Sequence, residues 1–302
     1  MSFDPDALID RRRLKRKLRW WQAATLATVA LAVLAGLQAN DLLFKRDTVA
    51  RLRVTGLILE DPRRDALLAT IAEDPSVRAL IVHLDSPGGT VVGGEDLYRS
   101  LRAVSDKKPV VAVMGTVAAS AAYMTAVAGD RVFAREGTIT GSIGVLFQTA
   151  DITGLLDKLG IKPESLKSGP LKAVPSPTEP LTDEGRAATQ ALVLDLFEFF
   201  VDLVVERRPL DRAQVLQLAD GRVYTGRQAV ANGLIDAIGG ETEARDWLAA
   251  EKQIPRSIRA VTVKPKTEGT RLSEALSGLT GKSLFSNALT LDGLLSVWHP
   301  DL

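Results

Sequence analysis

Short apolar runs alternate with stretches of helical periodicity through the middle of this 302-residue chain. Runs rich in Val, Ile and Leu predict strands over residues 49–58, 79–84, 110–114 and 131–134. Apolar spacings of three and four residues predict helices over residues 65–73, 93–105, 120–128, 152–159 and 185–207. Strands that alternate with helices are typical of an α/β fold with a largely parallel sheet. The pattern therefore predicts an α/β body.

The N-terminal segment has a different pattern from the body. Residues 1–19 contain seven basic and three acidic side chains, and residues 20–39 are twenty residues without a charge. A helix of that length spans about 30 Å, the thickness of the hydrocarbon core of a bilayer. We expect residues 1–19 to be a cytoplasmic basic segment and 20–39 a transmembrane anchor, with the body exported. A cleavable signal peptide is the alternative, although Leu37-Gln38-Ala39 is a poor cleavage site.

The C-terminal half of the chain is less regular. Residues 171–180 contain three prolines and no periodicity, which predicts a loop. The body is predicted as one domain over residues 48–252, followed by a C-terminal extension over 253–302. For residues 284–302 three interpretations stay open: a helix on a neighbouring subunit, a surface membrane contact, or a tail that visits a groove. The helix predicted over residues 185–207 carries an apolar stripe expected to face the core, at Leu192, Leu196, Phe199, Phe200 and Leu203.

Composition excludes several kinds of chemistry. The formal net charge is +1, and because residues 1–19 contribute +4, the rest of the chain carries 1 − 4 = −3. A mildly acidic body argues against nucleic acid as a partner. The chain has no cysteine, so disulfides, thiolate metal sites and a cysteine nucleophile are excluded. Its two histidines are far apart in the sequence, which argues against a histidine metal site or a Ser-His-Asp triad.

A serine among small residues follows the third predicted strand. Residues 115–123 read GTVAASAAY, and Ser120 is the serine at their centre. The second strand likewise leads into a glycine turn, Asp85-Ser86-Pro87-Gly88-Gly89. Strands that end in a glycine turn and in a small-residue helix start can aim backbone N–H groups at one point, as an oxyanion hole requires. The candidate chemistry is therefore acyl transfer at Ser120.

A serine nucleophile needs a base, and neither histidine suits that role. His83 lies inside an apolar strand and His299 near the end of the sequence. Lysine is the usual substitute, but it accepts a proton only when burial lowers its pKa from about 10.4. Chemistry alone does not choose among the four lysines that follow the serine, although the last has the most apolar context: Lys158, Lys162, Lys167 and Lys172.

Five segments, in this order, resemble a known family: DSPGG (85–89), AASAAY (118–123), TGSIGV (140–145), KSGxxK (167–172) and GRVYTGRQAVANGLIDAIGG (221–240). Together with the N-terminal segment they cover the chain from about residue 20 to 250. The chain resembles the short, single-repeat form of bacterial signal peptide peptidase A. These are membrane-anchored serine proteases of the Clp-protease/crotonase fold that use a Ser–Lys dyad. The resemblance implies that fold for residues 48–252.

The resemblance also assigns roles to single residues. It implies that Ser120 is the nucleophile, Lys172 the general base and Ser142 the hydroxyl that orients the lysine. The oxyanion hole would be formed by backbone N–H groups of Gly88 or Gly89 and of Ala121. The family usually has two glycines after the serine, where this chain has Ala121-Ala122. A positive φ at those alanines would be costly, which puts the geometry of the oxyanion hole in question.

From these residues and this resemblance we expect a single-pass protein of the cytoplasmic (inner) membrane with a periplasmic catalytic domain. It would be an endopeptidase for hydrophobic peptides such as remnant signal peptides, and a homo-oligomer that uses no metal, nucleotide or nucleic acid. Two alternatives stay open: an acyl-CoA hydratase or isomerase of the same superfamily, and a catalytically silent membrane scaffold.

Overall fold

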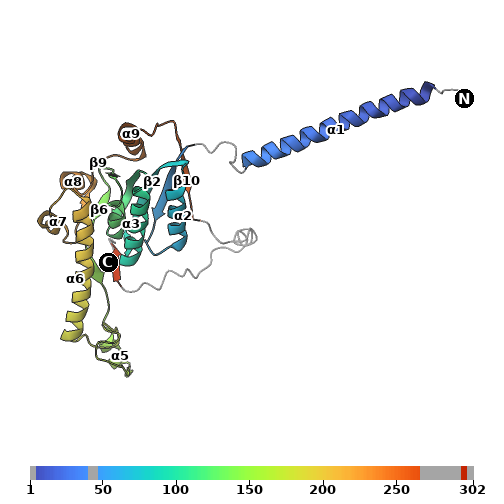
Figure 1. Cartoon of the computed structure of the whole chain (residues 1–302). Helices are drawn as coiled ribbons and strands as arrows, with labels where there is room; N and C mark the ends of the chain where they lie inside the picture. The colour runs from blue at the N-terminus through green and yellow to red at the C-terminus, as the bar shows by residue number, and fades with distance from the viewer. Residues whose placement is uncertain (1–4, 40–46, 266–293, 298–302) are drawn as a thin grey trace. The chain divides into compact units, whose positions relative to one another are not determined.

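The computed structural model describes residues 5–39, 47–265 and 294–297 of the chain (Figure 1). These residues belong to two compact units, 1–47 and 48–302. In the first unit, α1 (Pro5–Ala39) is a single helix of 35 residues. Among the described residues, no helix is both long and apolar enough to cross a membrane. The predicted anchor over residues 20–39 is therefore not confirmed.

The second unit is built on a sheet whose main path is parallel throughout. Its strands follow the order β10-β1-β2-β4-β5-β9. This arrangement confirms the α/β prediction. The sheet extends past residue 252, because β10 lies in the predicted C-terminal extension and pairs with β1. The bounds along this path are β10 (Arg259–Val263), β1 (Thr48–Thr55), β2 (Val77–Ser86), β4 (Val110–Ala119), β5 (Arg131–Ala134) and β9 (Ala237–Ile238).

The strand β4 is longer than predicted and changes partner along its length. Its first half pairs with β5, and its last three residues pair in parallel with β6 (Ile139–Gly141). In turn, β6 pairs antiparallel with β8 (Val223–Thr225). The predicted strand ended at Met114, yet Val117 to Ala119 complete the strand because β6 supplies a partner.

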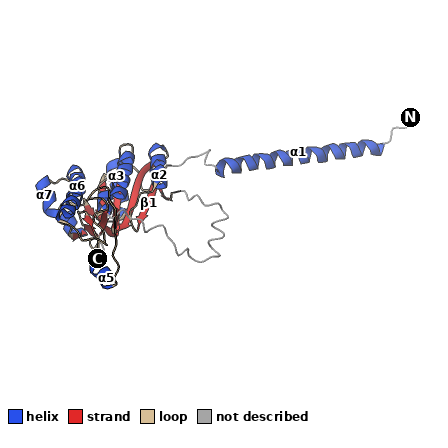
Figure 2. Ribbon diagram, turned by 90° about the horizontal axis from the view of Figure 1, so that it is seen from below, coloured by secondary structure: helices blue, strands red, loops and turns tan. Residues whose placement is uncertain are grey.

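Successive side chains of each strand point to opposite faces of the sheet, and each face packs into its own hydrophobic core. In β2, for example, Leu80, Val82 and Leu84 join one cluster of buried side chains, while Ala79 and Ile81 join the other. Only α9 (Glu241–Lys252) covers the second cluster within the described part of the chain. Figure 2 shows two of the opposite helices, α2 and α3, lying next to each other. The helices that contribute to the first cluster are α2 (Pro62–Glu73), α3 (Val91–Ser105), α4 (Ala121–Ala126) and α6 (Asp183–Arg207).

Three of these helices begin earlier than their apolar periodicity predicts, because polar side chains cap them. Asp61 accepts from the backbone N–H groups of Arg63 and Arg64 at the start of α2. Thr90 and Thr182 cap α3 and α6 in the same way. A capping oxygen satisfies N–H groups that have no partner inside the helix, which stabilises the first turn.

Residues 152–194, which we call the arm, project beyond the sheet (Figure 1). The arm contains α5 (Thr153–Lys158), the proline-containing loop and the first half of α6. The predicted apolar stripe is buried only at its far end: Phe200 is fully buried, whereas Leu192 is 46% exposed. Eight large apolar side chains of the arm are exposed: Ile152, Leu155, Leu159, Ile161, Leu166, Leu171, Leu192 and Leu194.

A second, three-stranded sheet has the order β3-β11-β7. It consists of β3 (Gly88–Thr90), β11 (Leu294–Val297) and β7 (Leu146–Phe147). Most of the predicted tail over residues 284–302 lies outside the described residues, but β11 belongs to it. The remaining helices of the unit are α7 (Arg212–Leu218) and α8 (Gly226–Ala231).

Candidate active site

The carboxyl ends of three strands, β2, β4 and β6, meet at one point. A bulge in β4 makes this possible: Leu84 of β2 pairs with Met114, but Ser86 pairs with Ala118. Gly115 lies within the bulge, where a Cβ atom would come within 3.0 Å of the Asp85 side chain. On the other side of β4, Ala118 pairs with Thr140 of β6. Three of the five motif segments, residues 85–89, 118–123 and 140–145, are therefore adjacent in space.

Ser120 occupies a strained turn between β4 and α4. Its backbone has φ 58° and ψ −123°, and the residue is only 1% exposed. Its N–H donates to the carbonyl of Gly141 at 2.8 Å. A non-glycine residue in such a conformation costs of order 1–3 kcal/mol and persists only where its surroundings impose it. A strained strand-to-helix turn is also how α/β-hydrolases expose a nucleophilic serine.

The alanines that replace the family's glycines fit this turn. Ala121 and Ala122 are fully buried residues at the start of α4, and neither has a positive φ. The left-handed conformation falls on Ser120 itself. The first N–H groups of a helix have no partner within it, so the N–H of Ala121 is not used by α4.

Ser142 occupies the position on β6 that corresponds to Ser120 on β4. Each serine follows the last paired residues of its strand, Ala119 and Gly141, and each has a positive φ. Neighbouring strands lie about 4.8 Å apart, so the two serines are neighbours. Ser142 is 8% exposed, and its N–H donates to the carbonyl of Arg222 at 2.8 Å. The structure therefore brings Ser142, the predicted lysine-orienting hydroxyl, next to Ser120.

The glycine turn after β2 is held tightly against residue 58. A Cβ atom at Gly89 would lie 1.8 Å from the carbonyl oxygen of Ile58, so only glycine fits there. The Gly88 carbonyl accepts from the Ile58 N–H at 2.8 Å, and the Gly88 N–H donates to Ser86 Oγ at 3.1 Å. Sequence analysis left Gly88 and Gly89 open as oxyanion donors. The N–H of Gly88 therefore bonds within its own turn, whereas the N–H of Gly89 points to the edge of β3 that faces away from Ile58.

The segment 221–240, whose role the sequence did not reveal, packs against the residues that hold the Ser120 turn in place. Tyr123 of α4 is fully buried and donates through its hydroxyl to the carbonyl of Leu234 at 2.9 Å. Burial raises the pKa of this tyrosine, so it stays a neutral donor. Tyr224 packs under Gly141, where a Cβ atom would lie 2.6 Å from the tyrosine ring. The motif is therefore structural support for Ser120 and Ser142.

The candidate lysines differ in their surroundings. Lys167 forms an ion pair with Glu179, and its hydrogen bond lowers the pKa of that carboxyl. An ion pair with a carboxylate stabilises a charged lysine, which argues against Lys167 as the base. Lys158 and Lys162 are exposed. Lys172 is exposed as well, in a turn where its N–H donates to the carbonyl of Gly169 at 3.1 Å.

The two histidines lie outside this site as far as the structure describes them. His83 packs on the α9 side of the sheet, where its Nε2 lies 2.9 Å from Glu241 Oε2. Arg51 forms an ion pair with the same carboxylate. His299 lies outside the described residues. Across the described residues, no group of three or more histidine, aspartate or glutamate side chains is arranged to hold a metal ion.

Comparisons with known proteins match this unit to proteases. The model of peptidase family S49 matches residues 102–255, a range that includes Ser120, Ser142 and Lys172. The chain is 40% identical over 205 residues to putative protease slr0021 of Synechocystis, covering 68% of this chain and 74% of the relative. It is 36% identical over 234 residues to the putative signal peptide peptidase SppA of Enterococcus faecium, covering 77% and 67%. It is 31% identical over 229 residues to the chloroplastic serine protease SPPA of Arabidopsis thaliana, covering 76% and 34%.

The fold and these relatives define a serine-type peptidase. The chain belongs to peptidase family S49 and is a member of the SppA type. Family membership decides against the acyl-CoA enzyme that the sequence left open. It also confirms the resemblance drawn from the five motif segments.

Proposed function

We propose that the protein is an endopeptidase in which Ser120 is the nucleophile and Lys172 the general base. Ser120 Oγ would attack the peptide carbonyl carbon while its proton passes to Lys172 Nζ. Collapse of the tetrahedral intermediate would break the C–N bond and return that proton to the leaving amine. Water then hydrolyses the acyl-enzyme, with the lysine again accepting a proton. The observation that carries the proposal is the strained, buried turn of Ser120 where β2, β4 and β6 end.

The other residues of the site would act through position. Ser142, next to Ser120 in the strand register, would hydrogen-bond the lysine amine and orient it. The N–H groups of Gly89 and Ala121 would stabilise the oxyanion, a contribution that typically reaches 3 kcal/mol or so per donor. The mechanism needs only these groups and water, and no metal or nucleotide.

The exposed position of Lys172 leads to a second part of the proposal. A general base must come within hydrogen-bond reach of the serine and must lose its hydration to be neutral. The lysine loop therefore has to become buried when the site is active. We propose that a second copy of the chain covers the arm, since the arm exposes eight large apolar side chains that its own unit leaves uncovered. The active form would be a homo-oligomer.

For substrate and location we propose hydrophobic peptides, such as remnant signal peptides, at the cytoplasmic membrane. The segments around the turn are rich in Ala, Val, Gly and Ile, so a charged side chain bound there would lose its hydration without gaining a partner. The uncharged segment 20–39, preceded by a basic cluster, supports a single-pass anchor with the N-terminus inside. The catalytic unit would then be periplasmic.

Labelling with a fluorophosphonate probe tests the proposal and separates a protease from a silent scaffold. The probe reacts with an activated serine, so we expect covalent modification of Ser120 in the full-length chain and hydrolysis of a signal-peptide substrate. Ser120→Ala removes one oxygen and should abolish both, while the thermal unfolding midpoint stays unchanged. The matched control is Ser76→Ala, which replaces a serine in the loop before β2, distant in sequence from Ser120. Labelling at another serine, or none at all in an active preparation, would overturn the assignment.

A further inference from the structure

The bulge in β4 determines where along the sheet Ser120 lies. Between two successive pairs of the β2–β4 register, β2 contributes one residue, Asp85, whereas β4 contributes three, Gly115-Thr116-Val117. If the bulge were straightened, Ser120 would lie roughly 6.6 Å further along β2, two residues at about 3.3 Å each. Bulges occur often beside active sites, because the extra residues redirect the side chains that follow them.

Two side chains bond to the backbone of this bulge from either side of β4. Asp85 Oδ1 accepts the N–H of Val117 at 3.1 Å. From the other side, Thr138 Oγ1 donates to the carbonyl of Gly115 at 2.7 Å and accepts the N–H of Arg135 at 3.0 Å. Thr138 is only 2% exposed, so its hydroxyl is shielded from water. We call Asp85 and Thr138 the bulge clamp.

The bulge clamp lies between the glycine turn and the serine. Asp85 directly precedes Ser86, whose Oγ accepts the N–H of Gly88 at 3.1 Å and so belongs to the glycine turn. On β4, Ser120 follows the bulge by three residues. The clamp therefore connects the strand that leads into the turn with the strand that leads into the serine. Its hydrogen bonds set the position of Ser120 relative to the N–H of Gly89.

We propose that Asp85 and Thr138 are positioning residues for the peptidase reaction. By fixing the bulge, they hold Ser120 Oγ where it can attack a carbonyl whose oxygen bonds to the Gly89 N–H. This proposal rests on the proposed function, in which Ser120 is the nucleophile. A misplacement of about 1 Å can cost about 10²-fold in rate, so two hydrogen bonds that exchange no proton with the substrate are sufficient to control it.

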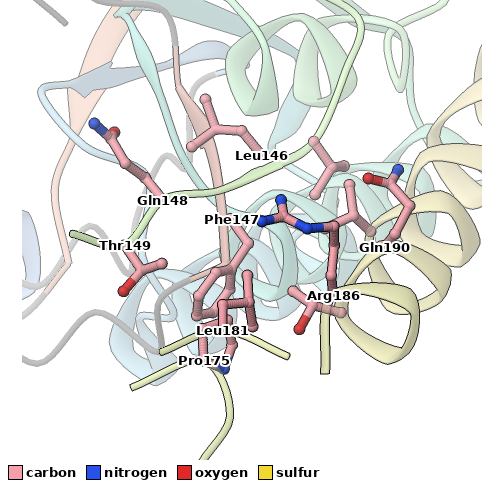
Figure 3. A pocket seen from close by; sticks show the side chains of 11 residues that line it. Leu146, Phe147, Gln148, Thr149, Pro175, Leu181, Arg186 and Gln190 are labelled. Carbon is pink, nitrogen blue, oxygen red and sulfur yellow. The ribbon is translucent and has the colours of Figure 1, made fainter. Parts of the chain in front are cut away.

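The bulge clamp should act on kcat and leave KM nearly unchanged. Residues 145–149 and side chains of the arm line a pocket of about 580 Å³, and Figure 3 shows Phe147 and Leu181 among them. Neither Asp85 nor Thr138 is one of the lining residues. A substrate side chain bound in this pocket keeps its contacts when the clamp is lost, while the attack by Ser120 slows. A loss confined to the transition state lowers kcat and kcat/KM equally.

The test compares a disruptive and a conservative variant of each clamp residue in the full-length chain. Asp85→Ala removes the acceptor, whereas Asp85→Asn keeps an oxygen that can accept the N–H of Val117. We expect Asp85→Ala to lower kcat about 10²-fold for a hydrophobic peptide, and Asp85→Asn to recover most of that loss. Thr138→Val and Thr138→Ser form the equivalent pair, since serine retains the hydroxyl. Hydrogen exchange at the Val117 amide should become faster in Asp85→Ala and not in Asp85→Asn, a readout that needs no catalysis.

Asp130→Ala is the matched control. Asp130 Oδ2 accepts the N–H of Val110 at 2.9 Å, so it is also a carboxylate bonded to the backbone of β4, but at the opposite end of the strand. Its loss should lower the thermal unfolding midpoint and leave kcat close to that of the unchanged protein. Thermal unfolding of every variant checks folding, and if Asp85→Ala does not fold, the two Thr138 variants decide the question by the same comparison.

Two results would overturn the proposal. One is a folded Asp85→Ala or Thr138→Val chain with unchanged kcat, and the other is an Asp130→Ala chain that loses as much kcat as Asp85→Ala. Ser120→Ala, measured in parallel, separates this failure from failure of the proposed function. An active Ser120→Ala chain would overturn the assignment of the nucleophile, whereas an inactive one beside a fully active Asp85→Ala chain would overturn the bulge clamp alone.

Discussion

Ser120 lies at a turn that the sheet holds in place, whereas Lys172 lies on an exposed loop of the arm. Around the serine, β2, β4 and β6 converge, and Tyr123 anchors the following helix to the segment 221–240. Around the lysine, Leu171 is 40% exposed and Leu166 is 95% exposed. The surroundings that hold Ser120 are therefore complete within one copy of the unit, whereas those that would bury Lys172 are not.

The difference shows that Ser120 and Lys172 depend on different physical conditions for their proposed roles. A strained backbone can be maintained only by dense packing, which the sheet supplies at Ser120. Removing water from a lysine favours its neutral form, and the arm by itself leaves Lys172 exposed to water. The comparison therefore predicts that substitutions near Ser120 change the stability of the folded unit. Substitutions in the arm should instead change self-association and the burial of Lys172.

The largest effect is expected at the lysine. Lys172→Arg keeps the positive charge but cannot accept a proton, because a guanidinium stays protonated. It should reduce kcat by about 10²- to 10⁴-fold, as much as Lys172→Ala does, since both remove the general base. Peptide hydrolysis by the full-length chain measures this, with thermal unfolding as a check on folding.

Lys167→Ala provides the matched control for the lysine. It removes a lysine five positions away that is already paired with Glu179. We expect it to keep most of the activity, because its role is to hold the loop. Loss of activity in Lys167→Ala together with an active Lys172→Arg would transfer the role of base to Lys167.

The next effect concerns the packing under the serines. Gly141 has φ 83°, and a Cβ atom there would lie 2.6 Å from the Tyr224 ring. Gly141→Ala should therefore destabilise the unit by about 1–3 kcal/mol, through strain and overpacking. It should also lower kcat, because Gly141 accepts the N–H of Ser120.

Gly137→Ala is a control in the same segment, four positions earlier. A Cβ atom at Gly137 meets nothing within 4 Å. Urea unfolding of the two variants should separate them clearly, with Gly137→Ala close to the unchanged protein. Equal stabilities would mean that the close packing of Gly141 on Tyr224 does not hold the turn.

These positions also show what the sequence could and could not predict. The apolar runs and glycine turns were sufficient to predict that Ser120 lies near Gly88 and Gly89, because parallel strands end at a common edge. The bulge at Gly115 was not predictable, since it arises from the fit between β4 and the Asp85 side chain. The same holds for the choice of Gly89 over Gly88, which depends on one hydrogen bond from Gly88 to Ser86.

Long-range pairing accounts for the other differences. Tyr123 is one of several small or apolar residues in its segment, and its hydrogen bond to Leu234 spans 111 positions. Likewise, the sequence LLSV at 294–297 has no alternation that would predict a strand, and it becomes one because β3 and β7 offer edges on both sides. Local patterns predict elements, but they do not predict these partners.

A smaller effect is expected from the apolar surface of the arm. Leu194 is 49% exposed on α6, and an aspartate there would place a charge in any interface that covers the arm. Leu194→Asp should weaken self-association at least about tenfold, equivalent to 1.4 kcal/mol, and slow fluorophosphonate labelling at low protein concentration. Leu216→Asp, on α7 outside the arm and 41% exposed, is the matched control.

Light scattering and labelling, measured together, decide whether assembly completes the site. If Leu194→Asp dissociates the protein and labelling slows in parallel, the arm and the lysine depend on the neighbouring copy. A monomer that labels at the rate of the unchanged protein would show that the lysine loop becomes buried by itself.

The smallest effect concerns His83, on the face of the sheet opposite Ser120. Burial lowers the pKa of His83 from its ordinary value of 6.5, and this outweighs the opposing influence of Glu241. Below pH 6.5 the unfolded chain binds a proton that the folded chain resists, so folding loses stability as the pH falls. The contribution is complete above pH 6.5 and decreases as the pH falls through the folded-state pKa.

His83→Gln removes the titration and retains a donor for Glu241. Urea unfolding at about pH 7.5 and pH 5.5 should therefore show a smaller loss of stability in this variant than in the unchanged protein. His299→Gln removes the other histidine and serves as the control. The protonation of carboxylates is common to all three proteins, so the difference between them isolates the histidine. If His83→Gln loses as much stability on acidification as the unchanged protein, burial of His83 does not depress its pKa, and the acid sensitivity originates elsewhere in the fold.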